Sequence, residues 1–174
     1  MKQILLAVVA GTAAFGASAA DGTFAASNVI GGVRQYVYNP DGSKLSVSLG
    51  AVEFLYNGGV VGQGTYRFLK DGLFSAGTVA IPDQAGKTVD ITIEVWDKTY
   101  GETYEIAATK PFALLLLPQT VTITLGGAGS PPATAASLTG FTGGTLYFAN
   151  VPEPSGIALA ALGLGGLFFV SRRK

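Results

Sequence analysis

Residues 88–96 read Thr88-Val89-Asp90-Ile91-Thr92-Ile93-Glu94-Val95-Trp96. Valine and isoleucine occupy every second position of this stretch, and mostly polar residues occupy the positions between them. Successive side chains of a β-strand point to opposite faces of the sheet. A period of two therefore indicates a strand with one buried face and one face in water, which is typical of antiparallel sheets.

The same alternation occurs at residues 44–49 and 120–125. Further segments rich in strand-forming residues predict strands at 34–38, 52–56, 65–69, 75–81, 104–108 and 145–148. Turn-forming residues separate them, as in Asn39-Pro40-Asp41-Gly42 and Asn57-Gly58-Gly59. No segment between the two termini has helical periodicity. The sequence predicts a mainly β fold, an antiparallel β-sandwich of immunoglobulin-like or jelly-roll-like type, with a small barrel as the alternative.

The N-terminus has the three regions of a secretory signal peptide. Lys2 supplies a positive start, residues 4–15 are apolar and small, and Ala17-Ser18-Ala19 forms an A-x-A cleavage site. We expect a signal helix over residues 1–19, removed after Ala19, with removal after Ala20 as the alternative. The expected partners are the Sec translocon and signal peptidase, so the protein is predicted to be exported.

The last 24 residues combine three features in a fixed order. In Pro152-Glu153-Pro154, one carboxylate lies between two prolines, which favour an extended backbone before them. An uncharged apolar run follows at 156–170, and the chain ends in Ser171, Arg172, Arg173 and Lys174. A helix over this run would span about 22 Å, less than the ~30 Å hydrocarbon core. We expect a marginal, transient single membrane helix with Arg172, Arg173 and Lys174 as a cytoplasmic stop-transfer signal; a permanent membrane helix is the alternative.

This combination resembles the PEP-CTERM protein-sorting domain of Gram-negative bacteria. The resemblance implies that Pro152, Glu153 and Pro154 are the recognition motif of an exosortase, a membrane-embedded cysteine transpeptidase. It further implies an intermediate anchored in the inner membrane, followed by delivery to the cell surface or to the extracellular, exopolysaccharide-containing matrix.

The chain therefore divides into four predicted parts. They are a signal peptide at 1–19, a β-sandwich domain at 20–125, a connector rich in Gly, Ser, Pro and Thr at 126–150, and a sorting segment at 151–174. Within the connector, residues 145–148 are an alternative last strand. Residues 20–150 hold seven basic and ten acidic residues, a net charge of −3. A mildly acidic domain lacks the basic footprint of a nucleic-acid binder, so no nucleic-acid partner is expected.

Cysteine and histidine are both absent from the chain. Their absence excludes disulfides, Ser-His-Asp and Cys-His catalysis, and histidine-ligated zinc. We expect no cofactor, no metal and no catalytic residue. Asp90 and Glu94 share a strand face but would lie about 13 Å apart along it, too far for an acid–base pair. A carboxylate-based hydrolase would instead need two buried acids that face each other in a cleft.

Aromatic residues offer the other candidate site. Trp96, Tyr100 and Tyr104 fall within one predicted hairpin. Exposed rings on a β-sandwich can stack on sugars, which makes these three the candidate glycan contacts and exopolysaccharide a candidate partner. The alternative is that Trp96 packs at the sheet edge or covers the end of the core. The sequence thus favours a non-enzymatic exported surface or matrix protein over a carbohydrate-binding adhesin, and both over a hydrolase.

Overall fold

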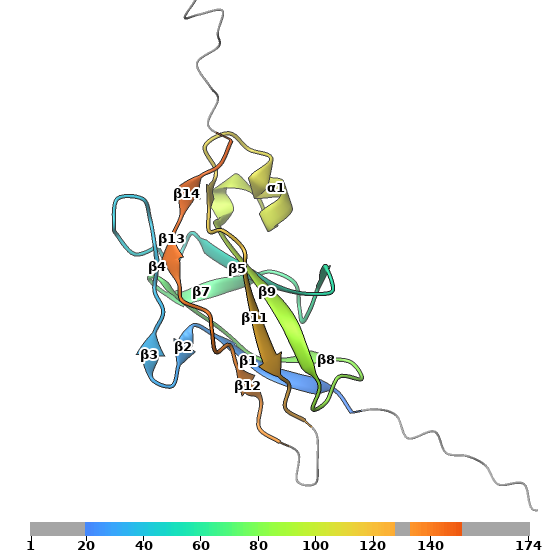
Figure 1. Cartoon of the computed structure of the whole chain (residues 1–174). Coiled ribbons are helices and arrows are strands. Elements are labelled where there is room, and N and C mark those ends of the chain that lie inside the picture. The colour runs from blue at the N-terminus through green and yellow to red at the C-terminus, as the bar shows by residue number, and fades with distance from the viewer. Residues whose placement is uncertain (1–19, 128–132, 151–174) are drawn as a thin grey trace, which may run out of the picture.

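The alternating stretch forms the strand β9 (Thr88–Asp97) in the computed structural model, which describes residues 20–127 and 133–150 (Figure 1). β9 pairs antiparallel with β5 (Gly50–Tyr56) on one side and with β11 (Gln119–Thr124) on the other. All of its inward-facing side chains are buried, as the period of two predicts: Val89, Ile91, Ile93 and Val95.

One large sheet contains most of the strands. Its hydrogen-bonded order is β12-β1-β8-β7-β5-β9-β10-β14, and β11 and β6 are attached to β9 and β5. The remaining bounds in this sheet are β1 (Gly22–Ser27), β6 (Gly59–Val60), β7 (Tyr66–Lys70), β8 (Leu73–Ile81), β10 (Leu114–Leu115), β12 (Ala136–Ser137) and β14 (Tyr147–Phe148). Two small sheets flank it, formed by β2 (Val29–Ile30) with β3 (Val33–Arg34) and by β4 (Val37–Tyr38) with β13 (Gly144–Thr145).

The large sheet curls until its two sides meet. The Thr23 N–H donates to the Gly126 carbonyl at 3.2 Å, and the Gly126 N–H donates to the Thr23 carbonyl at 2.8 Å. These bonds join the chain after β11 to β1. In the strand order, β1 is separated from β9, the partner of β11, by β8, β7 and β5. The predicted mainly β class is confirmed. The predicted β-sandwich, with two separate layers, is not confirmed, because hydrogen bonds link the strands into one continuous curled sheet.

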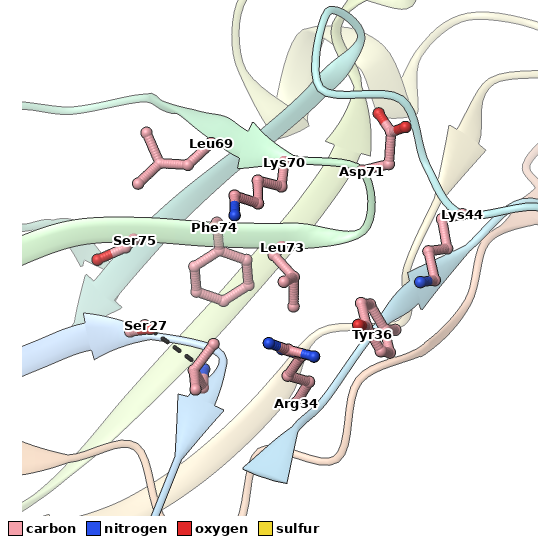
Figure 2. Close-up of a pocket in the computed structure, with 11 residues that line it drawn as sticks. Ser27, Arg34, Tyr36, Lys44, Leu69, Lys70, Asp71, Leu73, Phe74 and Ser75 are labelled. Atoms are coloured by element: carbon pink, nitrogen blue, oxygen red, sulfur yellow. Dashed lines mark hydrogen bonds between the residues drawn. The ribbon is translucent and has the colours of Figure 1, made fainter. Parts of the chain in front are cut away.

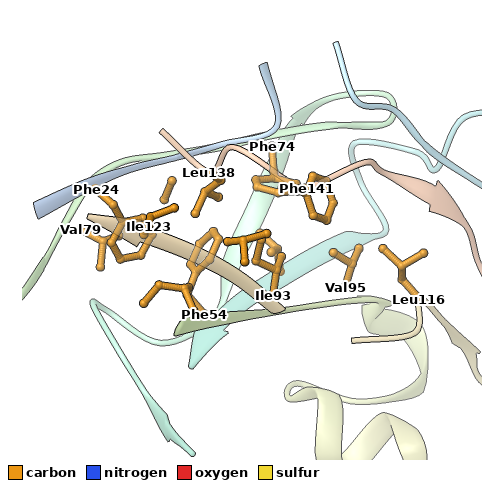
Figure 3. Close-up of a cluster of buried hydrophobic side chains, with 14 of the residues drawn as sticks. Phe24, Phe54, Phe74, Val79, Ile93, Val95, Leu116, Ile123, Leu138 and Phe141 are labelled. Atoms are coloured by element: carbon orange, nitrogen blue, oxygen red, sulfur yellow. The ribbon is translucent and has the colours of Figure 1, made fainter. Parts of the chain in front are cut away.

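The curl encloses one apolar core (Figure 3). A row of aromatic rings runs through it, with centroids 5.6 Å apart for Phe24 and Phe54, 5.9 Å for Phe54 and Phe74, and 5.6 Å for Phe74 and Phe141. Each pair meets edge to face, the arrangement that aromatic quadrupoles favour. Since these rings come from β1, β5, β8 and the segment after β12, the core ties distant parts of the chain together.

Residues 133–150 belong to this core, which corrects the prediction of a connector over 126–150. Leu138, Phe141 and Leu146 are 0%, 1% and 2% exposed. β12 pairs parallel with β1, and β14 pairs antiparallel with β10; the alternative last strand corresponds to β13 and β14. Small residues dominate this segment, so the alternation that marks a strand is not visible in it, although its few large apolar residues close the core.

Two predicted strands are also wrong. Residues 104–108 form the short helix α1 (Tyr104–Ala108), which follows the 3₁₀ turn η1 (Lys98–Tyr100). The Thr103 hydroxyl caps α1 by accepting the Ile106 N–H at 3.3 Å. Residues 44–49 have one bridge at Lys44 and a turn at 47–49, where the Ser46 carbonyl accepts the N–H groups of Leu49 and Gly50.

Within residues 20–127 and 133–150, no helix combines the length and apolarity needed to cross a membrane. The predicted signal helix at 1–19 and the predicted membrane helix at 156–170 both lie outside these residues.

If the C-terminal segment is part of the core, Phe141→Ala will lower the free energy of unfolding of the full-length protein by about 3–5 kcal/mol. Phe148 is 50% exposed and provides the matched control, with an expected loss for Phe148→Ala below about 1 kcal/mol. Urea unfolding followed by tryptophan fluorescence measures both. Equal, small losses would contradict the assignment of residues 133–150 to the core.

Candidate functional site

An open pocket of about 630 Å³ lies beside the β2–β3 ribbon (Figure 2). The end of β1 and the ribbon form one wall, and the β7–β8 hairpin forms the opposite one. The segment of Tyr36 and Lys44, around β4, closes one end. The pocket is lined by basic, hydroxyl, aromatic and aliphatic side chains.

One buried amide holds the walls together. Asn28 is 0% exposed, and its Nδ2 donates to the carbonyls of Gln35 at 2.7 Å and Gly72 at 3.0 Å. Its Oδ1 accepts the Phe74 N–H at 2.9 Å. Both N–H donors of the amide and one acceptor position of its oxygen are used, so Asn28 links the chain after the ribbon to the β7–β8 hairpin. A buried amide satisfied in this way fixes the relative position of the loops it joins.

The Asp71-Gly72 turn of the hairpin docks closely on β4. Gly72 has a φ of +71°, and a side-chain carbon there would lie 2.9 Å from the Val37 carbonyl oxygen. Only glycine suits both the left-handed backbone and this approach. The Val37 N–H donates to the Gly72 carbonyl at 3.1 Å, and the Gly72 N–H donates to the Leu45 carbonyl at 2.7 Å. The turn thereby sets the end wall of the pocket.

The pocket concentrates positive charge. Arg34, Lys44 and Lys70 line it, three of the seven basic residues of an acidic domain. The one carboxylate in the lining, Asp71, accepts the Val47 N–H at 2.8 Å, and in Figure 2 its oxygens point away from Arg34. The lining therefore carries a net charge of +2.

Tyr36 lies among these cations. The Lys44 Nζ is 3.8 Å from the centroid of its ring, within cation–π distance. Burial acts to raise the pKa of the Tyr36 hydroxyl, but the nearby positive charges of Lys44 and Arg34 outweigh it and lower that pKa. The arrangement can bind an anionic group beside an aromatic face.

A second polar cluster lies on the outer face of the sheet. Glu53 on β5 is directly opposite Glu94 on β9, and Glu53 is 3% exposed. The Glu53 Oε1 accepts the Tyr104 N–H at 3.2 Å, which favours a charge on Glu53. Burial, the charge of Glu53, the hydrogen bond to Glu53 and the charge of Glu105 together raise the pKa of Glu94 to about 7. Burial also raises the pKa of Glu53, so both carboxyl groups of the pair favour the protonated form more than free glutamates do.

The predicted glycan contacts are not on the surface. Trp96 is 0% exposed and its Nε1 donates to the Gly101 carbonyl at 2.8 Å. Tyr104 is 8% exposed, meets Trp96 edge to face at 6.1 Å, and donates its hydroxyl to the Leu116 carbonyl at 3.0 Å. Tyr100 is half-buried against the same cluster. The prediction of an exposed ring platform is therefore wrong, because η1 and α1 fold over the outer face of β9 and cover it.

The other predicted site residues lie outside the part of the chain that the structure describes. They are the cleavage-site residues Ala17 and Ala19, the motif Pro152, Glu153 and Pro154, and the basic end Arg172, Arg173 and Lys174. Among the residues it does describe, no group of three or more carboxylates is arranged to hold a metal ion.

Sequence reasoning missed both polar sites for the same reason. Arg34, Lys44 and Lys70 are far apart in sequence, and only the contact of β4 with the β7–β8 hairpin brings them together. Glu53 and Glu94 meet through the register of β5 and β9, which the sequence does not specify.

Comparison with known proteins gives one match. A family model described as the PEP-CTERM protein-sorting motif matches residues 150–174. No curated protein and no solved structure matches the chain. The match begins at the last described residue, Asn150, and covers the segment that follows the folded domain.

Because Trp96 is a core residue, Trp96→Ala will lower the free energy of unfolding by about 3–5 kcal/mol. Thermal unfolding of the full-length protein, followed by circular dichroism, measures this loss. An unchanged melting temperature would show that the ring is not packed as described.

The Glu53–Glu94 pair will make stability fall as pH rises. The pKa of Glu94 is about 7 in the folded protein and near 4.5 without these neighbours, so its contribution is complete at low pH and is lost as the pH rises through 7. After allowance for its partial exposure to solvent, we expect a loss of about 1 kcal/mol between about pH 5 and pH 8. Glu94→Gln will flatten this dependence, whereas the exposed Glu102→Gln will preserve it. Melting temperatures across this range measure both, and an unchanged slope in Glu94→Gln contradicts the assignment.

Proposed function

We propose that this chain, a PEP-CTERM domain-containing protein, is a non-enzymatic exported protein that an exosortase delivers to the cell surface or extracellular matrix. The observation that carries the proposal is the sorting motif matched at residues 150–174. In this scheme the Sec translocon exports the chain, and signal peptidase removes residues 1–19. The C-terminal segment then holds the protein in the inner membrane of a Gram-negative cell until the exosortase acts at Pro152-Glu153-Pro154.

The end of the folded domain bears on where the exosortase would act. The Ala149 N–H donates to the Ala113 carbonyl at 2.7 Å, and the Asn150 side-chain amide donates to the Ala108 carbonyl. These bonds fix the chain beside α1 up to the residue at which the motif match begins. Pro152 is only two residues further along the sequence, so the processing enzyme would work directly beside the α1 and β14 end of the domain (Figure 1).

The buried position of Glu53 supports a non-enzymatic role. A hydrolase would need substrate to reach two carboxylates, whereas Glu53 is 3% exposed and the backbone of Tyr104 lies against it.

We keep a carbohydrate-binding adhesin as the second candidate function. The observation that favours it is the open pocket with Tyr36 and three cations, rather than the buried Trp96 cluster. The pocket volume of about 630 Å³ is in the range of sites for small ligands.

The sorting proposal is tested by changing both prolines of the motif. In cells that contain the exosortase, Pro152→Ala with Pro154→Ala will leave the protein in the membrane fraction with its C-terminus intact, because the extended recognition segment is lost. Pro131→Ala with Pro132→Ala changes the same number of prolines upstream of the motif and will leave processing unchanged. Fractionation followed by mass spectrometry of C-terminal peptides measures the outcome.

Wild-type protein from the surface or matrix fraction should lack residues beyond about Ser155. The recovery of intact Lys174 in that fraction would contradict processing at the motif. Equal processing of the two proline variants would show that the motif is not what the enzyme recognises.

A further inference from the structure

We infer that the pocket between the β2–β3 ribbon and the β7–β8 hairpin binds an acidic saccharide, whose anionic group is held by Arg34, Lys44 and Lys70. The inference rests on the second candidate function, the carbohydrate-binding adhesin, and names its ligand class and its site.

Charge is the first argument. Three cations around one cavity repel each other, and the lining supplies only Asp71 as a counter-charge, which is bonded to the Val47 backbone. An anion entering the pocket would relieve this repulsion and accept charge-assisted hydrogen bonds. A planar carboxylate or a sulfate also fits the forked donors of Arg34, which can bind two oxygens at once.

The rigidity of the walls is the second argument. Asn28 and Gly72 hold the two loops in place through buried backbone and side-chain hydrogen bonds. A site that already has its bound shape loses less conformational entropy when a ligand enters. The basic side chains are exposed at their ends, but the frame that carries them is fixed.

The rest of the lining favours a sugar over a simple inorganic anion. Tyr36 and Leu73 provide an aromatic and an aliphatic surface, and Ser27 and Ser75 provide hydroxyls across the pocket. A sugar ring has an apolar face for such a surface and hydroxyls for such partners.

The test compares two charge-matched double variants of the full-length protein, purified in a non-ionic detergent. Arg34→Gln with Lys70→Gln removes two pocket cations, and Arg67→Gln with Lys110→Gln removes two exposed cations that do not line it. The probes are polygalacturonate, dextran sulfate and neutral dextran, measured by calorimetry. We expect the pocket variant to bind the two acidic probes at least about tenfold more weakly than wild type, and the control variant to bind within about twofold of it.

A third variant tests the sugar ring. Tyr36→Leu will weaken binding of both acidic polysaccharides. The concentration of inorganic sulfate needed to displace them will fall in proportion to this lower affinity. Melting temperatures of all variants within a few degrees of wild type establish that they are folded.

Each other outcome overturns the inference. Equal losses in the two double variants would show long-range attraction rather than a site. Displacement of polygalacturonate by inorganic sulfate at equal molar concentration would show an anion site without saccharide recognition, and tighter binding of single-stranded DNA would show a different ligand class. Neutral dextran bound equally well by all variants would leave the adhesin proposal standing without this pocket. If no saccharide is bound at all, the adhesin proposal fails as well.

Discussion

A single sheet with one apolar face and no second layer must curl to remove that face from water. The hydrophobic effect rewards each buried square ångström of the inward side chains of β1, β5, β8, β9 and β11, and only curvature brings these faces together. The Thr23–Gly126 hydrogen bonds close the curl, and the row of phenylalanine rings fills it. Leu138 and Phe141, from the segment after β12, are buried in the same core.

The outer face of the same sheet shows what happens where polar residues are covered. η1 and α1 fold over the β5–β9 pair and bury Trp96, Tyr104 and Glu53 together. Burial of one carboxylate beside another is tolerable because the raised pKa of Glu94 favours its neutral form and because the Tyr104 N–H donates to Glu53. The buried pair therefore makes part of the protein's stability depend on pH, whereas the same carboxylates on a solvent-exposed strand face would not.

The pocket has the opposite character, since its polar groups remain open to solvent while its frame is buried. Asn28 and Gly72 lie in the frame, whereas Arg34, Lys44 and Tyr36 are presented by it. Ligand sites commonly combine a rigid scaffold with exposed loop residues in this way. The domain end from which the sorting segment continues carries α1 and β14, while the pocket is formed by β1–β4 and the β7–β8 hairpin (Figure 1). Sorting and binding would therefore use different elements of one small domain.

The sequence by itself determined the β class and the inner face of β9, because a period of two in Val and Ile is local and has one physical meaning. It also determined the sorting motif, which depends on residue order alone. It could not determine α1, since Tyr104–Ala108 is apolar enough for a strand and becomes a helix through the Thr103 cap and packing on Trp96. Only the tertiary structure decided that Trp96 is buried, that Glu53 meets Glu94, and that three distant cations share a pocket. Each of these depends on strand register and on the contact of loops far apart in sequence, and local preference does not encode either.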